Sequence, residues 1–316
     1  MTNLPRMLTN REVEALRGPK AAVDAYRPYA CLVEPECAAN GRVEDVATIF
    51  LTNRECPFRC VFCDLWRHTL DEPTPAGAVP MQIDWALAQL PPAPHIKLYN
   101  SGNFFDPQAI PVADYPAIAE RVREFHTVIV ENHPRLCGDR VWDFQQRLAA
   151  RLEVALGLET VHPEILPRLN KQMTVADFEH ASRELRRRDC DVRAFVILQL
   201  PGMTESEGIE WAVRSVATAF AAGAQCASII PLRGGNGAME ELAHPGGVAR
   251  PSLPALYETL CRSLELRGGR VFVDLWGVES VFSCKKCGVN QAAVLQEMNL
   301  LQTIRPWPRC DCAGGT

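Results

Sequence analysis

The sequence lacks long hydrophobic runs and any large excess of charge. No apolar stretch approaches the roughly 18 uninterrupted residues that a membrane helix needs, and the N-terminal segment has no apolar signal-peptide core. We therefore expect a cytoplasmic protein with no membrane partner. The 33 basic and 38 acidic residues give a net charge of −5, which provides no electrostatic support for tight, nonspecific binding of nucleic acid. Short repeats and low-complexity segments are also lacking.

Cysteine, in contrast, is abundant, with 13 in 316 residues. A reducing cytoplasm disfavours disulfides, so clustered cysteines are better interpreted as metal ligands. One cluster lies in residues 56–63 and a second in residues 284–312. The isolated cysteines are predicted to be small buried hydrophobic side chains. These are Cys31, Cys37, Cys137, Cys190, Cys226 and Cys261.

Short apolar runs alternate with helical patterns along most of the chain. The runs are rich in β-branched and aliphatic residues at consecutive positions, which is typical of strands buried on both faces of a parallel sheet. The candidate strands are residues 48–52, 95–100, 127–131, 152–157, 192–200, 226–231 and 270–275. Repeated strand–helix units imply right-handed crossovers. We predict an α/β fold: a partial (β/α)6-type barrel with a parallel sheet, plus a Cys-rich C-terminal extension.

Two helices have clear start signals. Thr204 and Glu207 form a candidate capping box, and Thr174 precedes a second amphipathic helix. The run of arginines at 186–188 lies near the end of that second helix, where positive charge complements the helix dipole. A solvated helix face explains this run better than a nucleic-acid site does.

The pattern divides the chain into three parts. Residues 1–45 precede the alternation and are predicted to be an N-terminal extension. Residues 46–275 are predicted to form the core barrel. Residues 276–316 break the alternation and carry four cysteines, so we expect a separate metal-binding element there.

The first cysteine cluster closely follows the first predicted strand. Cys56, Cys60 and Cys63 are spaced Cys-x-x-x-Cys-x-x-Cys, in a loop at the end of the strand where β/α barrels place their chemistry. Three thiolates can bind three irons of a cubane and leave the fourth iron without a protein ligand. The alternative is a zinc loop or buried free thiols. Zinc in a structural site takes four ligands, and His68 is a candidate for the fourth.

This spacing, with an aromatic residue before the last cysteine, resembles the signature of the radical S-adenosylmethionine (SAM) superfamily. The resemblance implies a [4Fe–4S] cluster whose open iron is chelated by the amino and carboxylate groups of SAM. It also implies reductive cleavage of SAM to a 5′-deoxyadenosyl radical that abstracts hydrogen from the substrate. Such an enzyme needs an electron donor, and a flavodoxin- or ferredoxin-like protein is expected.

The resemblance also assigns candidate SAM contacts at the ends of the following strands. Ser101, Gly102 and Asn103 occupy the segment that holds the SAM amino group, although Asn103 replaces the usual acidic residue. Glu131 and Glu159 are candidates for contact with the ribose and sulfonium. Structural ion pairs, with Lys171 and Arg193 as candidate partners, are the alternative role for these glutamates.

Three further residues are assigned to the adenine side of SAM. Gly202 lies in the segment after the fifth predicted strand, and Pro231 ends the sixth. Phe62 precedes the last cysteine of the triplet and should pack near adenine, where simple core filling is the alternative.

Beyond the triplet, the chain most resembles the branch of the superfamily that includes the radical SAM partner of archaeosine formation in tRNA. The resemblance is carried by residues 98–102, 157–160 and 170–174. It implies C–H chemistry, of the lyase type or another, on a small molecule or on a modified nucleoside or tRNA. The alternative from another functional class is a noncatalytic Fe–S or zinc-binding partner subunit.

The second cysteine cluster consists of two close pairs. Cys284 and Cys287 form a Cys-x-x-Cys turn followed by glycine, and Cys310 and Cys312 follow near the C-terminus. Four thiolates would complete the tetrahedron of a zinc ion. An auxiliary Fe–S cluster and unliganded thiols are the other two interpretations that the sequence leaves open.

Overall fold

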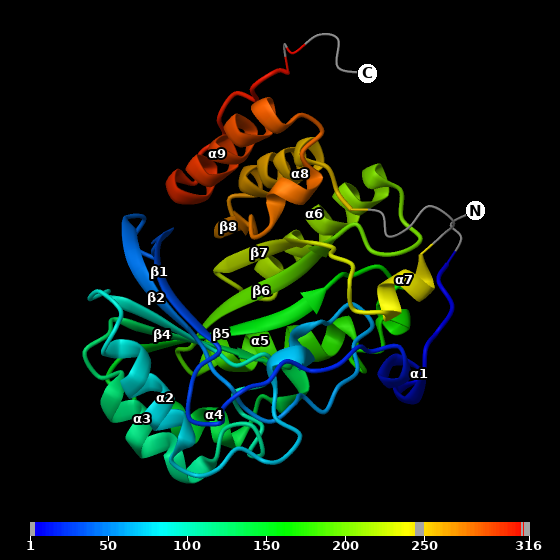
Figure 1. Ribbon diagram of the computed structural model, residues 1–316. Coiled ribbons are helices and arrows are strands. Elements are labelled where there is room, and N and C mark those ends of the chain that lie inside the picture. Colours follow the sequence, from blue (N-terminus) through cyan, green and yellow to red (C-terminus); the bar gives the residue numbers. More distant parts are fainter. Residues whose placement is uncertain (1–3, 244–249, 311, 313–316) are drawn as a thin grey trace.

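The computed structural model describes residues 4–243, 250–310 and 312. In this part of the chain, one sheet has its eight strands in sequential order, and it curls into an open half-barrel (Figure 1). Strands β2 to β8 run parallel, and β1 is antiparallel to β2. The strands are β1 Ala30–Cys37, β2 Val43–Phe50, β3 His95–Tyr99, β4 Thr127–Asn132, β5 Arg151–Glu159, β6 Asp191–Leu198, β7 Cys226–Pro231 and β8 Arg270–Val273. The predicted fold class is confirmed.

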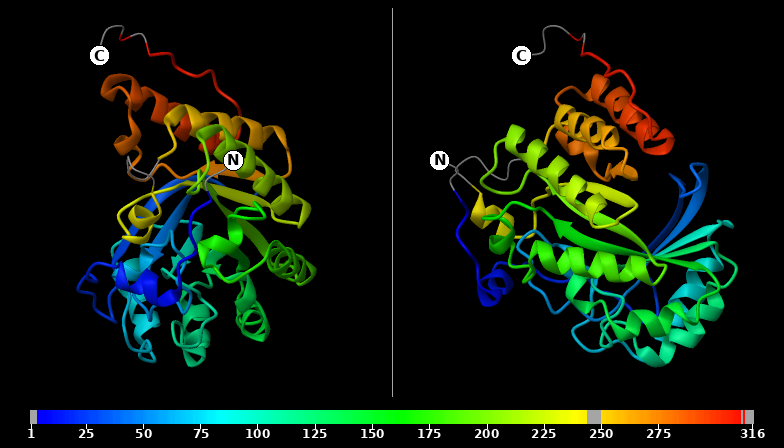
Figure 2. Two further views of the ribbon diagram at one scale, coloured as in Figure 1. Left: turned by 90° about the vertical axis from the view of Figure 1, so that its right-hand side faces the viewer. Right: turned by 180° about the vertical axis from the view of Figure 1, so that it is seen from behind.

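Helices connect the parallel strands and cover the outer face of the sheet (Figure 2). The helices are α1 Asn10–Ala15, α2 Ala78–Leu87, α3 Tyr115–Arg121, α4 Asp139–Gln145, α5 Val175–Arg187, α6 Glu205–Ala221, α7 Ala238–Leu242, α8 Leu253–Glu265 and α9 Lys285–Leu301. Among the helices in the described ranges, none is both long and apolar enough to cross a membrane.

Side chains alternate between the two faces of the sheet. On β3, Ile96 and Leu98 are fully buried in the main hydrophobic core, which also contains residues of α2, α3 and α5. Successive side chains of a strand point to opposite faces, so Lys97 and Tyr99 face the concave side. We call this concave side the barrel interior. The carboxyl ends of the parallel strands form one rim, to which the cysteine loop is attached.

The predicted capping box at Thr204 is present, and Thr174 forms a second one. The Thr174 hydroxyl accepts a hydrogen bond from Asp177 N, and the Thr204 hydroxyl accepts one from Glu207 N. The three arginines near the end of α5 have local partners. Arg186 pairs with Asp191, Arg187 pairs with Glu184, and Arg188 lies over the Trp142 ring. These contacts agree with the structural interpretation of the arginine run.

The segment predicted as an N-terminal extension, residues 1–45, contains the first strand of the sheet. Strand β1 pairs along its whole length with β2, and β2 itself starts at Val43. The pattern of β1 is hard to recognise because it is a partly exposed edge strand that contains Glu34, Pro35 and Glu36. Proline is tolerated there because an edge strand does not need every backbone donor.

Candidate functional site

The cysteine loop is fixed at the rim by hydrogen bonds from several strands and loops. Its start is tied to β3, because Leu51 N donates to Tyr99 O at 2.7 Å. The buried Gln82 side chain of α2 then makes two hydrogen bonds to the backbone of Thr52, at 2.8 and 2.7 Å. Val61 N, inside the triplet, donates to Leu169 O at 3.0 Å. The loop therefore has a defined shape that does not depend on the cysteines alone.

Two asparagines fasten the other side of the loop. Asn170 Nδ2 donates to Arg59 O at 2.8 Å, and Asn236 Nδ2 donates to Val61 O at the same distance. Asn236 is buried in the segment between β7 and α7, and its Oδ1 caps Met239 N. Sequence reasoning did not identify Gln82 or Asn236. The signals in the sequence were weak: Gln82 is one of two polar residues in a mainly apolar helix, and Asn236 lies in a turn rich in glycine.

The three thiols of the loop converge; Cys60 is buried, and Cys56 and Cys63 are partly buried. Burial raises the pKa of Cys56, raises that of Cys60 to about 12, and raises that of Cys63 further. The negative charge of Cys60 and Cys56 adds to the rise at Cys63, so the sulfurs lie close enough to interact. Such thiols are neutral and unreactive by themselves, and metal coordination deprotonates a thiol outright.

The spacing of the three thiols distinguishes between the two metal alternatives. Among the described residues, the only set of three or more candidate ligands that is compact enough for a single ion is the C-terminal one, and Cys56, Cys60 and Cys63 do not belong to it. His68, the fourth zinc ligand considered above, instead stacks on Tyr29 with ring centroids 4.7 Å apart. A cubane spreads its thiolate ligands over separate irons, so the wider arrangement fits a cluster better than one zinc ion.

Asn103 contacts the triplet directly. Its amide nitrogen lies 3.1 Å from Cys56 Sγ, and its Oδ1 accepts a hydrogen bond from His133 N at 2.7 Å. The His133 ring stacks on Phe58 of the cysteine loop, with centroids 3.8 Å apart. Asn103 therefore links the residue after β4 to a thiol of the triplet and directs a donor at its sulfur.

Glu131 organises the turn that contains Ser101 and Gly102. Its Oε1 accepts hydrogen bonds from Asn100 N at 2.7 Å and from Gly102 N at 3.3 Å. Burial raises the pKa of Glu131 to about 6, although the turn amides oppose the rise. The Ser101 hydroxyl lies 2.8 Å from the hydroxyl of Tyr29, which belongs to the N-terminal segment. The structure thus brings Ser101, Gly102 and Glu131 together.

Glu159 forms a buried ion pair with Lys171. The Lys171 Nζ lies 2.7 Å from Glu159 Oε1, and both side chains are less than 10% exposed. The Lys171 ammonium also lies 5.9 Å from the centroid of the Phe62 ring. Its positive charge lowers the pKa of Cys56 and Cys60, which places it beside the triplet. The pair is the ion pair that the sequence offers as the alternative role for Glu159, and the structure places Lys171 beside the triplet.

Gly202 and Pro231 lie on the same rim as the cysteine loop. Gly202 follows β6 in a turn and has a φ of +87°, which favours glycine. Pro231 is the last residue of β7, where it pairs with Leu198. Their contact with SAM stays a prediction.

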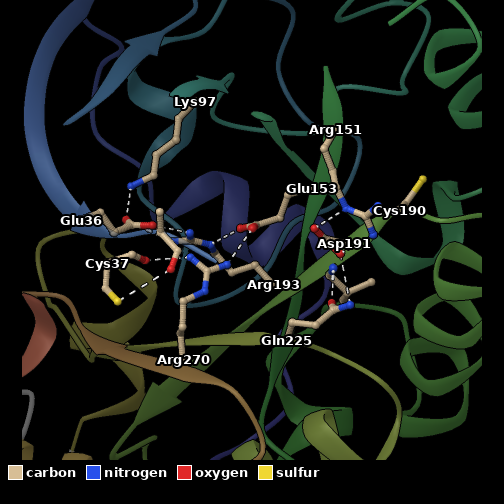
Figure 3. Close-up of polar contacts among 12 residues, drawn as sticks. Glu36, Cys37, Lys97, Arg151, Glu153, Cys190, Asp191, Arg193, Gln225 and Arg270 are labelled. Carbon is tan, nitrogen blue, oxygen red and sulfur yellow. Dashed lines mark hydrogen bonds and ion pairs between the residues drawn. The ribbon is translucent and has the colours of Figure 1, made fainter. Parts of the chain in front are cut away.

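The opposite end of the barrel interior is closed by a network of charges (Figure 3). Glu36 pairs with both Lys97 and Arg193, and Glu153 pairs with Arg193 at 2.6 Å and with Arg270 at 3.1 Å. Burial by itself raises the pKa of Glu36, but the charges of Arg193 and Lys97 hold it well below its usual range. This network joins β1, β3, β5, β6 and β8 at the end of the barrel interior that lies away from the cysteine loop.

Aromatic rings lie between this network and the rim. Tyr99 is two residues beyond Lys97 on β3, and its ring meets those of Phe50 and Phe195 at 6.4 and 6.2 Å. Trp276, which is 54% exposed, packs edge-on against Phe50 at 5.7 Å. The barrel interior therefore offers flat apolar surfaces below the cysteine loop.

The four C-terminal cysteines come together as a second, separate group. The sulfurs of Cys284, Cys287, Cys310 and Cys312 all lie within 4.8 Å of one another. The backbone amide of Cys287 is the main cause that lowers the pKa of Cys284 to about 7. A compact set of four thiols could hold a metal ion.

Comparisons with known proteins agree with this geometry. The chain is 24% identical to archaeosine synthase subunit beta of Methanosarcina acetivorans over 80% of its own length and 77% of that protein. It is 20% identical to an uncharacterised protein of Methanocaldococcus jannaschii, over 92% of its length and 86% of that protein.

The fold is similar to that of Elp3 from Methanocaldococcus infernus, with a TM-score of 0.50 and 14% identity over 71% of this chain. The chain spans 59% of the length of that Elp3 chain. Residues 50–213, slightly more than half of the chain, match the family described as the Radical SAM superfamily. The chain belongs to the radical SAM superfamily.

Proposed function

We propose that this protein is a radical SAM enzyme that holds a [4Fe–4S] cluster through Cys56, Cys60 and Cys63 and binds SAM beside it. The observation that carries this proposal is the arrangement of three converging thiols in one rim loop, one buried and two partly buried, in a set not compact enough for a single ion. When bound, the reduced cluster supplies the electron that splits SAM into methionine and a 5′-deoxyadenosyl radical, which abstracts hydrogen from the substrate.

The residues around the triplet suit this role. Asn103 donates a hydrogen bond toward Cys56 Sγ, and such bonds tune the reduction potential of a cluster. Lys171 offsets the negative charge that the thiolates bring into a buried site. Both side chains are held in position by further contacts, Asn103 by His133 N and Lys171 by Glu159.

The turn at residues 101–103 and the Glu159 carboxylate are the proposed SAM contacts. Glu131 holds the amides of the turn in place, which leaves the Ser101 and Gly102 backbone as a preformed surface at the rim. Glu159 has a φ of +64°, an unusual conformation for a residue with a side chain. Backbone strain of this kind is frequent at ligand sites. Phe62, Gly202 and Pro231 are proposed to line the adenine side.

We propose a substrate with a planar ring, of which a modified nucleoside, free or in tRNA, is the first candidate. The similarity to archaeosine synthase subunit beta supports a nucleoside. The rings of Phe50, Tyr99 and Phe195 in the barrel interior support it independently, because aromatic side chains stack on bases. A small molecule with a planar group would use the same surfaces.

The similarity to a subunit also suggests that this chain works with a partner protein. That relative is named as the beta subunit of a synthase, and the chain matches 77% of it. We propose two protein partners, a companion subunit and a flavodoxin- or ferredoxin-like electron donor.

Anaerobic reconstitution with iron and sulfide tests the proposal. The reduced protein should release 5′-deoxyadenosine from SAM, and the triple variant Cys56→Ala, Cys60→Ala, Cys63→Ala should release none. Cys31→Ala, which removes a cysteine outside both clusters, should keep the activity. Product from the triple variant would refute the proposal. A wild-type cluster that neither cleaves SAM nor changes its spectrum on SAM addition would identify a noncatalytic partner subunit instead.

A further inference from the structure

The C-terminal cysteines lie at the two ends of a segment that folds back on itself. Cys284 is the N-cap of α9, and Cys287 lies in its first turn. After α9 ends at Leu301, the chain returns along the helix and brings Cys310 and Cys312 back to its start. Cys287 Sγ and Cys312 Sγ are 3.5 Å apart.

The spacing of the four sulfurs fits one ion. A tetrahedral zinc ion with bonds of about 2.3 Å to sulfur sets its ligands about 3.8 Å apart. The observed upper limit of 4.8 Å leaves little more room than this. A cubane would spread the same four sulfurs over four irons, so the observed spacing fits one ion better than an auxiliary [4Fe–4S] cluster.

Four thiolates around one zinc ion would carry an excess of negative charge. Basic residues next to the four cysteines would offset this charge. Lys285 and Lys286 lie between the first two cysteines, and Arg309 precedes the third. The four thiolates would also lie at the N-terminal end of a 17-residue helix, where the helix dipole favours negative charge. Gly288 permits the close approach of the Phe282 ring to this turn, because an added Cβ would overlap that ring.

The returning tail makes defined contacts along α8 and α9. Tyr257 of α8 donates a hydrogen bond to Arg305 O at 2.7 Å, and its ring lies 4.6 Å from that of Trp307. Gln291 Nε2 donates to Pro308 O at 3.1 Å. These contacts are few and partly exposed, so the tail needs a further connection to stay in place.

Side chains at the C-terminal end of α9 form hydrogen bonds to the backbone of β8. Asn299 exchanges two hydrogen bonds with the backbone of Val273, both at 2.9 Å. Gln302 does the same with Val271, at 2.7 and 2.9 Å. Strand β8 lies at the edge of the sheet and has no further strand beside it. The two side-chain amides make the hydrogen bonds that such a strand would make with the backbone of β8.

We propose that one structural zinc ion is bound by Cys284, Cys287, Cys310 and Cys312. The ion would hold the tail at the start of α9 and so keep α9 in position beside the edge strand β8. All four ligands come from the protein, so the site is closed and takes no part in SAM cleavage. The inference is independent of the proposed function, because it uses none of the cysteines of the rim loop.

Metal analysis of purified variants tests this site. Wild-type protein should hold about one zinc ion per chain, as one four-coordinate site requires, with sulfur neighbours at about 2.3 Å in zinc X-ray absorption spectra. Cys310→Ser with Cys312→Ser should lose the zinc but keep the iron of the reconstituted cluster. Cys56→Ala with Cys60→Ala and Cys63→Ala should lose the iron but keep the zinc. Cys261→Ser, a matched control in α8, should keep both metals.

A second measurement follows the tail itself. Loss of zinc should expose residues 303–309 to proteolysis and speed hydrogen exchange at the amides of Val271 and Val273. Wild-type protein without zinc, zinc bound through nitrogen or oxygen, or zinc that stays in the Cys310→Ser, Cys312→Ser variant would each overturn the assignment. Iron that remains in the triple variant and disappears when the tail cysteines are replaced would also overturn it.

Discussion

The Lys171 ammonium lies 2.7 Å from the Glu159 carboxylate, and this pair is buried beside the thiols of the cysteine loop. Burying two charges is costly, and a buried ion pair is often no more stabilising than an apolar pair of the same size. Stability alone therefore gives little reason to keep this pair. A positive charge next to three cysteines that are proposed to coordinate iron, and a carboxylate at the rim, do give a reason.

Replacing Lys171 with Met should strongly destabilise the protein. The variant leaves the Glu159 carboxylate buried without its partner, and breaking a buried pair costs about 3–5 kcal/mol. Urea unfolding of the protein without its cluster measures the effect. Adding Glu159→Gln to Lys171→Met should recover much of the loss, because no uncompensated charge then remains. A double variant as unstable as the sum of the two single variants would contradict this explanation.

A side chain at Gly157 should destabilise the fold. A Cβ at this position would overlap the Glu159 carboxylate and the Lys171 ammonium. Overpacking of this kind typically costs about 1–3 kcal/mol, so Gly157→Ala should lower the free energy of unfolding by that amount. The matched control is Gly138→Ala, whose Cβ would meet nothing within 4 Å. Equal effects of the two substitutions would show that the ion pair does not restrict the space at Gly157.

Removal of the Asn103 amide should lower the reduction potential of the cluster. A donor to Cys56 Sγ favours the more negative, reduced state, and one hydrogen bond of about 1 kcal/mol corresponds to about 40 mV for one electron. A redox titration of Asn103→Ala without SAM, followed by electron paramagnetic resonance, measures the shift.

Asn132→Ala is the control for this shift. Its amide lies 3.5 Å from the sulfur of Cys137, which belongs to neither cluster. The substitution should leave the potential unchanged. If Asn103→Ala and wild type share one potential, the contact to Cys56 has no electronic effect.

The barrel could be predicted from the sequence because its strands are buried on both faces. Runs such as residues 226–231 are apolar at nearly every position, and the structure places β7 at those bounds. Helix starts were also readable, since the Thr204 capping box and the Thr174 N-cap are local in the sequence. Strand β1 was not recognised because its glutamates and proline hide the alternation of an edge strand.

The cysteines of the site were readable because their spacing is local, whereas their surroundings depend on distant segments. Asn236 reaches the triplet loop from 175 positions away, and Tyr29 reaches Ser101 from 72. The charged network of the barrel interior is also built from residues that lie far apart in the sequence. Glu36 and Arg193 meet only because the sheet curls, and no local pattern marks either residue as a partner of the other.

This network makes a prediction about pH. The folded-state pKa of Glu36 lies below the value of 4.5 of an unperturbed glutamate, so the carboxylate stabilises the fold above pH 4.5, and this contribution is lost as pH falls further. Glu36→Gln should cost about 3 kcal/mol at neutral pH, because Arg193 and Lys97 lose their partner. The difference between variant and wild type should shrink below pH 4.5, as measured by urea unfolding across pH 3–7. Glu72→Gln, an exposed control, should change stability by less than about 0.5 kcal/mol. A pH-independent difference for Glu36→Gln would mean that the carboxylate contributes by shape and not by charge.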